Sequence, residues 1–188
     1  MILSTLVNQY EKNMASYEEW KLSDFRSKYK KIEEHIEDAV WGYLPNRKRD
    51  SHQAQLDKDV LEEVTQQLLD QAIIDQLNQC KSFDEILIVI YCIKIKGFGA
   101  LSVYDTALRL GAYYHLYPDV VYLHTGAEDG AKRLLNLTPS DERIKYFCND
   151  SNYPYLPRDY FPIELQHLTA QHIENFLCRM KENLILRS

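Results

Sequence analysis

The chain has little of several residue types that mark particular classes of protein. Its four cysteines are far apart and form no CxxC pair, which argues against a zinc site of the usual spacing and against a disulfide-stapled module. The longest apolar run, residues 86–93, falls short of the roughly 20 residues that cross a bilayer, and no basic segment precedes the apolar residues at the N-terminus. We therefore expect a cytoplasmic protein with no metal site and no membrane partner.

Glycine and proline are also scarce, and positive charge is not in excess. Six residues of each in a chain of 188 are few for a turn-rich β architecture, whereas long windows rich in Glu, Lys, Gln and Leu favour helix. The apolar content of 45% is ample for a core. These features predict an all-α fold, with residues 1–188 forming a single domain.

Hydrophobic periodicity places the main helices. Apolar residues at steps of three and four follow Ser23, a good N-cap, and predict a long amphipathic helix that ends near Gly42, so that residues 1–45 form an N-terminal helical extension. A second helix is expected over 56–77. Further helix starts are expected at two capping-box patterns, Ser82 to Glu85 and Thr125 to Glu128, and at Thr169.

The sequence also predicts a surface ion pair in one segment and an ordered loop in another. In the helix after residue 100, Asp105 and Arg109 have the spacing of a favourable surface ion pair. Residues 151–162, with three prolines and three tyrosines, are expected to form an ordered loop.

The net charge of −6 means that a nucleic acid would have to be met by a local basic patch, because the field of the whole molecule repels it. The most basic stretch, 46–53, is expected to be a loop. Its candidate contacts to phosphates or bases are Arg47, Lys48, Arg49, His52 and Gln53. A simple solvated loop is the alternative.

The most informative motif is the segment Lys96-Gly97-Phe98-Gly99 between two helix-forming stretches. Glycine adopts positive φ and permits close approach of the backbone, and the first amides of the next helix are unpaired at its positive dipole end. Such a turn suits an anion, most simply a phosphate. Close packing of two helices is the structural alternative.

Residues 93–103, with Ala107, resemble the helix-hairpin-helix superfamily, which includes DNA glycosylases, although Lys96 stands where the family usually has proline. The resemblance implies a helix-hairpin-helix core over 82–137. It also implies a DNA phosphate held by backbone amides at Gly97, Phe98 and Gly99, with Lys96 alongside. Such hairpins often bind a monovalent cation, and no other cofactor is expected. DNA is favoured over RNA on the same ground. The function expected is non-catalytic binding of the nucleic-acid backbone.

Three other functions remain open at this stage. The first is a DNA glycosylase-like enzyme, which would need a catalytic aspartate at the cap of a later helix. In this chain the residue expected at that cap is Thr125, and the catalytic candidates nearby are Asp119 and His124. Leu101 also stands where the bifunctional glycosylases have a lysine. The second is a helical protein-interaction module. In the third, residues 85–95 are a strand that leads into a degenerate nucleotide-binding turn. The segments 104–111 and 121–127 also resemble an uncharacterised bacterial protein family, which supplies no mechanism.

Overall fold

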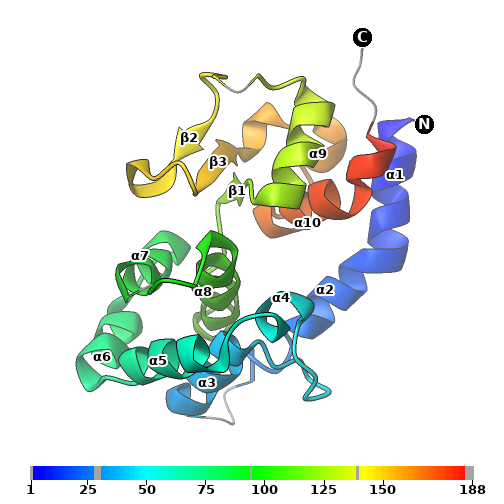
Figure 1. The fold of residues 1–188 in the computed structure, drawn as a ribbon. Helices are drawn as coiled ribbons and strands as arrows, with labels where there is room; N and C mark the ends of the chain where they lie inside the picture. The colour runs from blue at the N-terminus through cyan, green and yellow to red at the C-terminus, as the bar shows by residue number, and fades with distance from the viewer. Residues whose placement is uncertain (1, 28–30, 94, 139, 185–188) are drawn as a thin grey trace. The chain divides into compact units, whose positions relative to one another are not determined.

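The computed structural model describes residues 2–27, 31–93, 95–138 and 140–184, and it is mostly helical, as predicted (Figure 1). A small three-stranded sheet, which the all-α prediction did not include, accompanies the helices. The chain divides into two compact units: unit 1 comprises Met1–Glu18 and Asp119–Ser188, and unit 2 comprises Glu19–Pro118. The expected extension 1–45 and the expected core 82–137 are each divided between the units. The single domain over 1–188 stays a prediction.

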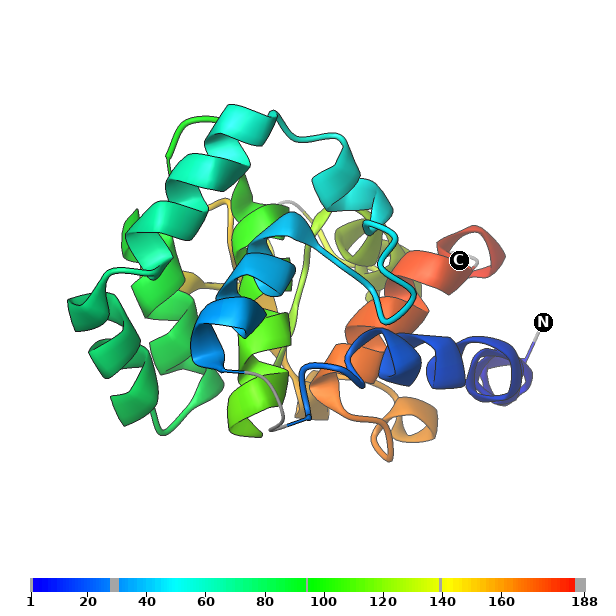
Figure 2. The ribbon, with the colours of Figure 1, turned by 90° about the horizontal axis from the view of Figure 1, so that it is seen from below.

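Unit 2 is built around helix α8, Ala100–Tyr114. Its other helices are α3 (Ile32–Trp41), α4 (Ser51–Ala54), α5 (Lys58–Leu68), α6 (Gln71–Gln79) and α7 (Phe83–Ile93). Helix α8 contacts α7 and α3, and α3 crosses it in Figure 2. Val103, Ala107 and Leu110 have no exposed surface, as the predicted helical face required.

Two helices predicted from the sequence differ from the structure. The first begins at a different residue, and the second is interrupted. Residues 22–26 form turns, and Ser23 Oγ donates to the carbonyl of Trp20 at 2.8 Å instead of capping a helix. The helix expected over 56–77 is broken after Leu68, because Asp70 accepts a hydrogen bond from the amide of Ala72 at 2.8 Å and begins α6. The cap that Asp70 provides for α6 thus ends the helix, although the apolar residues keep a helical spacing through 56–77.

The hydrogen bond between Ser82 and the amide of Glu85 confirms the main contact of the predicted capping box. Ser82 Oγ accepts a hydrogen bond from the amide of Glu85 at 3.3 Å, and the apolar run 86–93 belongs to α7. The nucleotide-binding interpretation required a strand at this place and is therefore wrong.

Unit 1 combines helices with the sheet. It contains α1 (Leu3–Tyr10), the π-helix η1 (Glu11–Ala15), the beginning of α2 (Ser16–Lys21), α9 (Thr125–Leu135), α10 (Ala170–Met180), and the short 3₁₀ turns η2 (Phe147–Asn149), η3 (Arg158–Tyr160), η4 (Ile163–Leu165) and η5 (Lys181–Asn183). Thr169 Oγ1 accepts from the amide of His172 at 3.2 Å, which confirms the predicted start of α10. The core of the unit includes Tyr10, Val121, Leu156 and Phe176.

The sheet has the order β1-β3-β2, with both pairings antiparallel. Its strands are β1 (Val120–Tyr122), β2 (Lys145–Tyr146) and β3 (Pro154–Pro157). Val121 pairs with Leu156, and Lys145 pairs with Tyr155. The segment 151–162, expected as a loop, thus supplies the central strand. Two of its three prolines, Pro154 and Pro157, stand at the ends of β3, where the lack of an amide donor costs least.

Candidate nucleic-acid interface

The turn between α7 and α8 is held by its first glycine. The amide of Phe98 donates to the carbonyl of Ile95 at 3.0 Å, and Gly97 has φ of +97°. This combination is that of a type II turn, in which the third residue takes positive φ and is usually glycine. Gly97 is therefore required by the local backbone.

The side chain of Phe98 anchors this turn. Phe98 is 2% exposed, so its ring belongs to the core of unit 2, and its amide is engaged within the turn. The sequence analysis expected Phe98 to offer that amide to a phosphate. The structure corrects this expectation: Phe98 positions the turn, and the available donors come from the residues that follow.

Gly99 is different, because nothing in the fold requires a glycine there. It is the N-cap of α8 with φ −75° and ψ 177°, values that any residue adopts. A Cβ added at Gly99 would have no heavy atom within 4 Å, and the residue is exposed. Close helix packing explains Gly97 but not Gly99.

The cap at Gly99 leaves the start of α8 open. Among the residues that the structure describes, no side chain caps this helix, and the amides of Ala100, Leu101 and Ser102 have no acceptor. Ser, Thr, Asp and Asn are the preferred N-caps because their oxygens satisfy such amides. The open amides and the positive end of a helix of 15 residues attract an anion, and the exposed Lys96 lies in the turn that precedes them.

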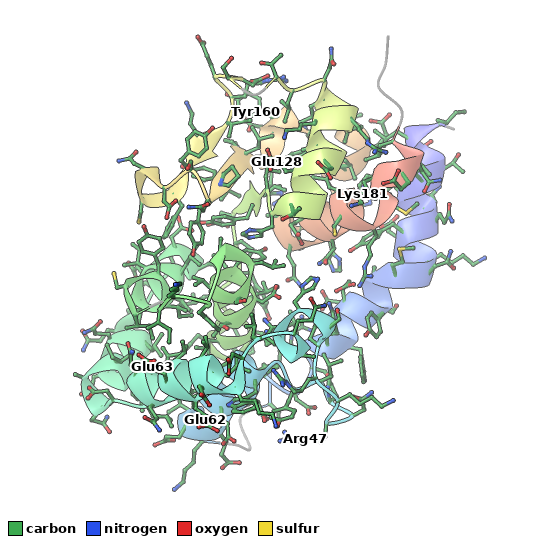
Figure 3. The ribbon with its side chains drawn as sticks, in the orientation of Figure 1. Arg47, Glu62, Glu63, Glu128, Tyr160 and Lys181 are labelled. Carbon is green, nitrogen blue, oxygen red and sulfur yellow. The ribbon has the colours of Figure 1, made fainter. Side chains whose placement is uncertain are left out.

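The arginines of the basic loop are partly engaged within the protein. Arg47 pairs with Asp38 at 2.7 Å and stacks over the ring of Tyr43 at 4.5 Å, although 59% of its side chain is exposed and it points outward (Figure 3). Arg49 Nε donates to the carbonyl of Trp41 at 3.0 Å. Lys48 is exposed. Of the three, Arg47 and Lys48 remain available to phosphates.

Gln53 is a core residue, contrary to the expectation that it reaches bases. It has no exposed surface. Its Nε2 donates to Asp105 Oδ2 at 3.2 Å, and its Oε1 accepts from Arg109 at 3.2 Å. Both ends of the amide are thus used to join α4 to α8.

Asp105 and Arg109 belong to a partly buried polar cluster and do not form the expected surface pair. Arg109 is 5% exposed; it donates to the carbonyl of Ala39 at 3.2 Å and lies 3.5 Å from Asp50 Oδ2. Asp105 lies 3.4 Å from His52 Nδ1. The sequence did carry a signal for this cluster: α8 is apolar on nearly all sides, which marks a buried helix whose charges must be paired.

These contacts set the charge of the cluster. Burial disfavours the Asp105 carboxylate, but the hydrogen bond from His52 and the charge of Arg109 outweigh it, so the pKa of Asp105 lies below its usual value. The same hydrogen bond raises the pKa of His52 against the opposing effect of burial. At neutral pH Asp105 is therefore ionised, and it accepts hydrogen bonds from His52 and Gln53.

The two catalytic candidates lie in unit 1. Asp119 is exposed and directly precedes β1. His124 is 6% exposed, stacks on Tyr122 with 6.2 Å between ring centroids, and occupies the N-cap position of α9. Thr125, expected to be that cap, is the first residue of the helix. No aspartate caps α9, which is the feature that a glycosylase-like site would need.

Comparison with family models, with curated proteins and with solved structures gave no significant match. In the described part of the chain, no three His, Cys, Asp or Glu side chains gather in a way that would hold a metal ion. Across the same residues, no helix combines the length and apolar character needed to cross a membrane.

Proposed function

We propose that unit 2 binds the phosphate backbone of nucleic acid, and DNA in preference to RNA, without catalysis. In this proposal α7, the turn at Lys96 to Gly99, and α8 act as a helix-hairpin-helix motif. One phosphate oxygen accepts hydrogen bonds from the open amides at the start of α8, and Lys96 supplies a positive charge beside it. A monovalent cation at the turn belongs to the same proposal.

The observation that carries the proposal is the open, exposed cap at Gly99. A glycine with ordinary φ and free space around it contributes less to stability than Ser or Asp would at the same position. The absence of a side chain has one clear benefit, which is that it leaves room for a ligand to approach the first amides of α8. Packing demands, which explain Gly97, do not apply here.

The distribution of charge limits how nucleic acid can approach. Helix α5 carries Glu62 and Glu63, both exposed, on its outer side (Figure 3), and the whole chain has a net charge of −6. A duplex is therefore repelled from most of the surface and attracted only locally. We expect few phosphate contacts and modest affinity that falls as salt is added.

The decisive experiment substitutes Gly99 and measures binding to a short fluorescein-labelled DNA duplex by anisotropy. Gly99→Asn fills the cap without changing the charge, and its amide oxygen occupies the donors that a phosphate would use; Gly99→Asp does the same and adds repulsion. We expect affinity to fall about tenfold or more for both, with Asp the weaker binder. Thermal stability should stay equal or rise, because both residues are better caps.

Gly99→Ala is the matched control, because it adds a Cβ into open space and no oxygen. It should retain binding within about twofold. Wild-type affinity in the Asn and Asp variants would show that the amides are not used. A parallel titration with RNA tests the preference for DNA, and Lys96→Ala should reduce the slope of log affinity against log salt by about 1.

A further inference from the structure

His52 extends from α4 toward the solvent beside α8. Its side chain is 51% exposed. In the described part of the chain its ring has one polar partner, Asp105 Oδ2, which lies 3.4 Å from Nδ1. Asp105 is in turn held by Gln53 at 3.2 Å. The ring is therefore fixed at one nitrogen, while the other edge is left for a ligand.

Several charged side chains lie around this ring. Asp105 and Asp50 are the carboxylates of the cluster, and Arg109 and Lys21 are its permanent cations; Lys21 lies 3.7 Å from Asp50 and Arg109 lies 3.5 Å from it. Arg49 adds a further positive charge nearby, because its guanidinium donates to the carbonyl of Gln53. Protonation of His52 adds one more positive charge to this cluster.

The position along α8 suits a second contact to the same strand. Asp105 follows the cap at Gly99 by six residues, or about 9 Å at 1.5 Å per residue. A DNA strand carries one phosphate for every 3.4 Å or so of axis. A group beside Asp105 is therefore close enough to the cap to contact a neighbouring phosphate of the same strand.

We propose that the His52 imidazolium is a second phosphate-binding group, so that nucleic-acid binding by unit 2 tightens when His52 is protonated. The inference rests on the proposed function and adds its regulation by pH. The hydrogen bond to Asp105 raises the pKa of His52 above 6.5, Asp50 acts in the same direction, and burial and Lys21 oppose them. The ordinary pKa of histidine lies closer to physiological pH than that of the other side chains, and here the shift is upward.

The test measures the affinity for the labelled DNA duplex at about pH 6 and about pH 8 at constant ionic strength. The wild type should bind about three- to tenfold more tightly at the lower pH. His52→Ala should bind at both pH values as the wild type does at the higher one. His52→Lys, which keeps the charge, should bind tightly at both. The exposure of the ring makes both variants compatible with folding.

A second readout follows the imidazole itself. If His52 contacts phosphate, its pKa measured by NMR should rise further when the duplex is added, because binding and protonation are linked. A purely structural histidine would titrate alike with and without DNA.

The outcomes separate the two proposals. Binding that is lost in Gly99→Asp, together with the same pH ratio in the wild type and His52→Ala, overturns the role of His52 and keeps the proposed function. A wild type that binds DNA at neither pH overturns both.

Discussion

Val60 of α5 lies directly against Gly97 of the turn. A Cβ at Gly97 would be 3.1 Å from Val60 Cγ2, which is closer than such atoms normally approach. Together with the positive φ of Gly97, this contact means that one glycine of the pair holds the turn in place, so that the other can be left open for a ligand. The two glycines can therefore be tested separately.

We expect Gly97→Ala to lower the free energy of unfolding by about 1–2 kcal/mol, because alanine is strained at positive φ and must displace Val60. Gly99→Ala should cost only about 0.5 kcal/mol, as alanine is a poorer cap than glycine. Urea denaturation of both variants provides the comparison. In a Val60→Ala background the cost of Gly97→Ala should decrease, since only the backbone strain remains; an unchanged cost would show that the contact contributes nothing.

The polar cluster predicts a large cost for removing its central amide. Gln53→Ala leaves the half-buried Asp105 and the buried Arg109 each without one hydrogen-bond partner, and we expect a loss of about 2–4 kcal/mol in the free energy of unfolding. Gln71→Ala is the control, because Gln71 bonds Asp75 on an exposed face at 2.8 Å and should cost less than about 0.5 kcal/mol. Equal costs would contradict the role of Gln53.

The pair of His52 and Asp105 also predicts how stability depends on pH. The pKa of His52 is raised from 6.5 by the hydrogen bond to Asp105, so its contribution is complete below pH 6.5 and is lost as the pH rises through the folded value. The pKa of Asp105 is lowered from 3.8, as its hydrogen bond with His52 and the charge of Arg109 outweigh burial. Its contribution is present above 3.8 and is lost on further acidification.

Between pH 6 and 8, then, the wild type should lose more stability than His52→Ala, as measured by urea denaturation at each pH. Parallel curves for the two proteins would rule out a stabilising pair.

In unit 1 the close contact of α9 with α10 depends on Gly130. A Cβ there would lie 2.3 Å from the carbonyl oxygen of Leu177, and a backbone atom cannot rotate away. We expect Gly130→Ala to cost about 1–3 kcal/mol or more, because the two helices must separate. At Gly126 the added Cβ would instead lie 2.7 Å from a side-chain atom, Cys178 Sγ. Combining Gly126→Ala with Cys178→Ala should therefore relieve most of that clash. No side-chain change should rescue Gly130→Ala. Thermal denaturation of the three variants tests this difference.

The elements that the sequence predicted well are those with a local signal. Ser82 and Thr169 cap helices by bonds to amides three residues ahead, and the apolar face of α8 is buried. The predicted secondary structure was wrong where a helix cap interrupted the apolar periodicity, or where a segment pairs with strands distant in the chain. Asp70 divides one predicted helix, and β3 forms because its backbone pairs with β1 and β2.

In the candidate site, too, the sequence predicted the local features but not those that depend on distant segments. The two glycines and Lys96 were identified from their order in the chain, but the engagement of the Phe98 amide and the burial of Gln53 were not. The expected Asp105–Arg109 surface pair was wrong because their surroundings come from α3 and from the segment around α4, more than 50 residues earlier in the chain.

By itself the sequence determined a mostly helical chain with a glycine turn before α8, since periodicity, caps and glycine act over three or four neighbouring residues. The tertiary structure decided which of those glycines is required and which donors and charges are left open. Packing of distant segments sets these properties: Val60 against Gly97, and Gln53 between Asp105 and Arg109.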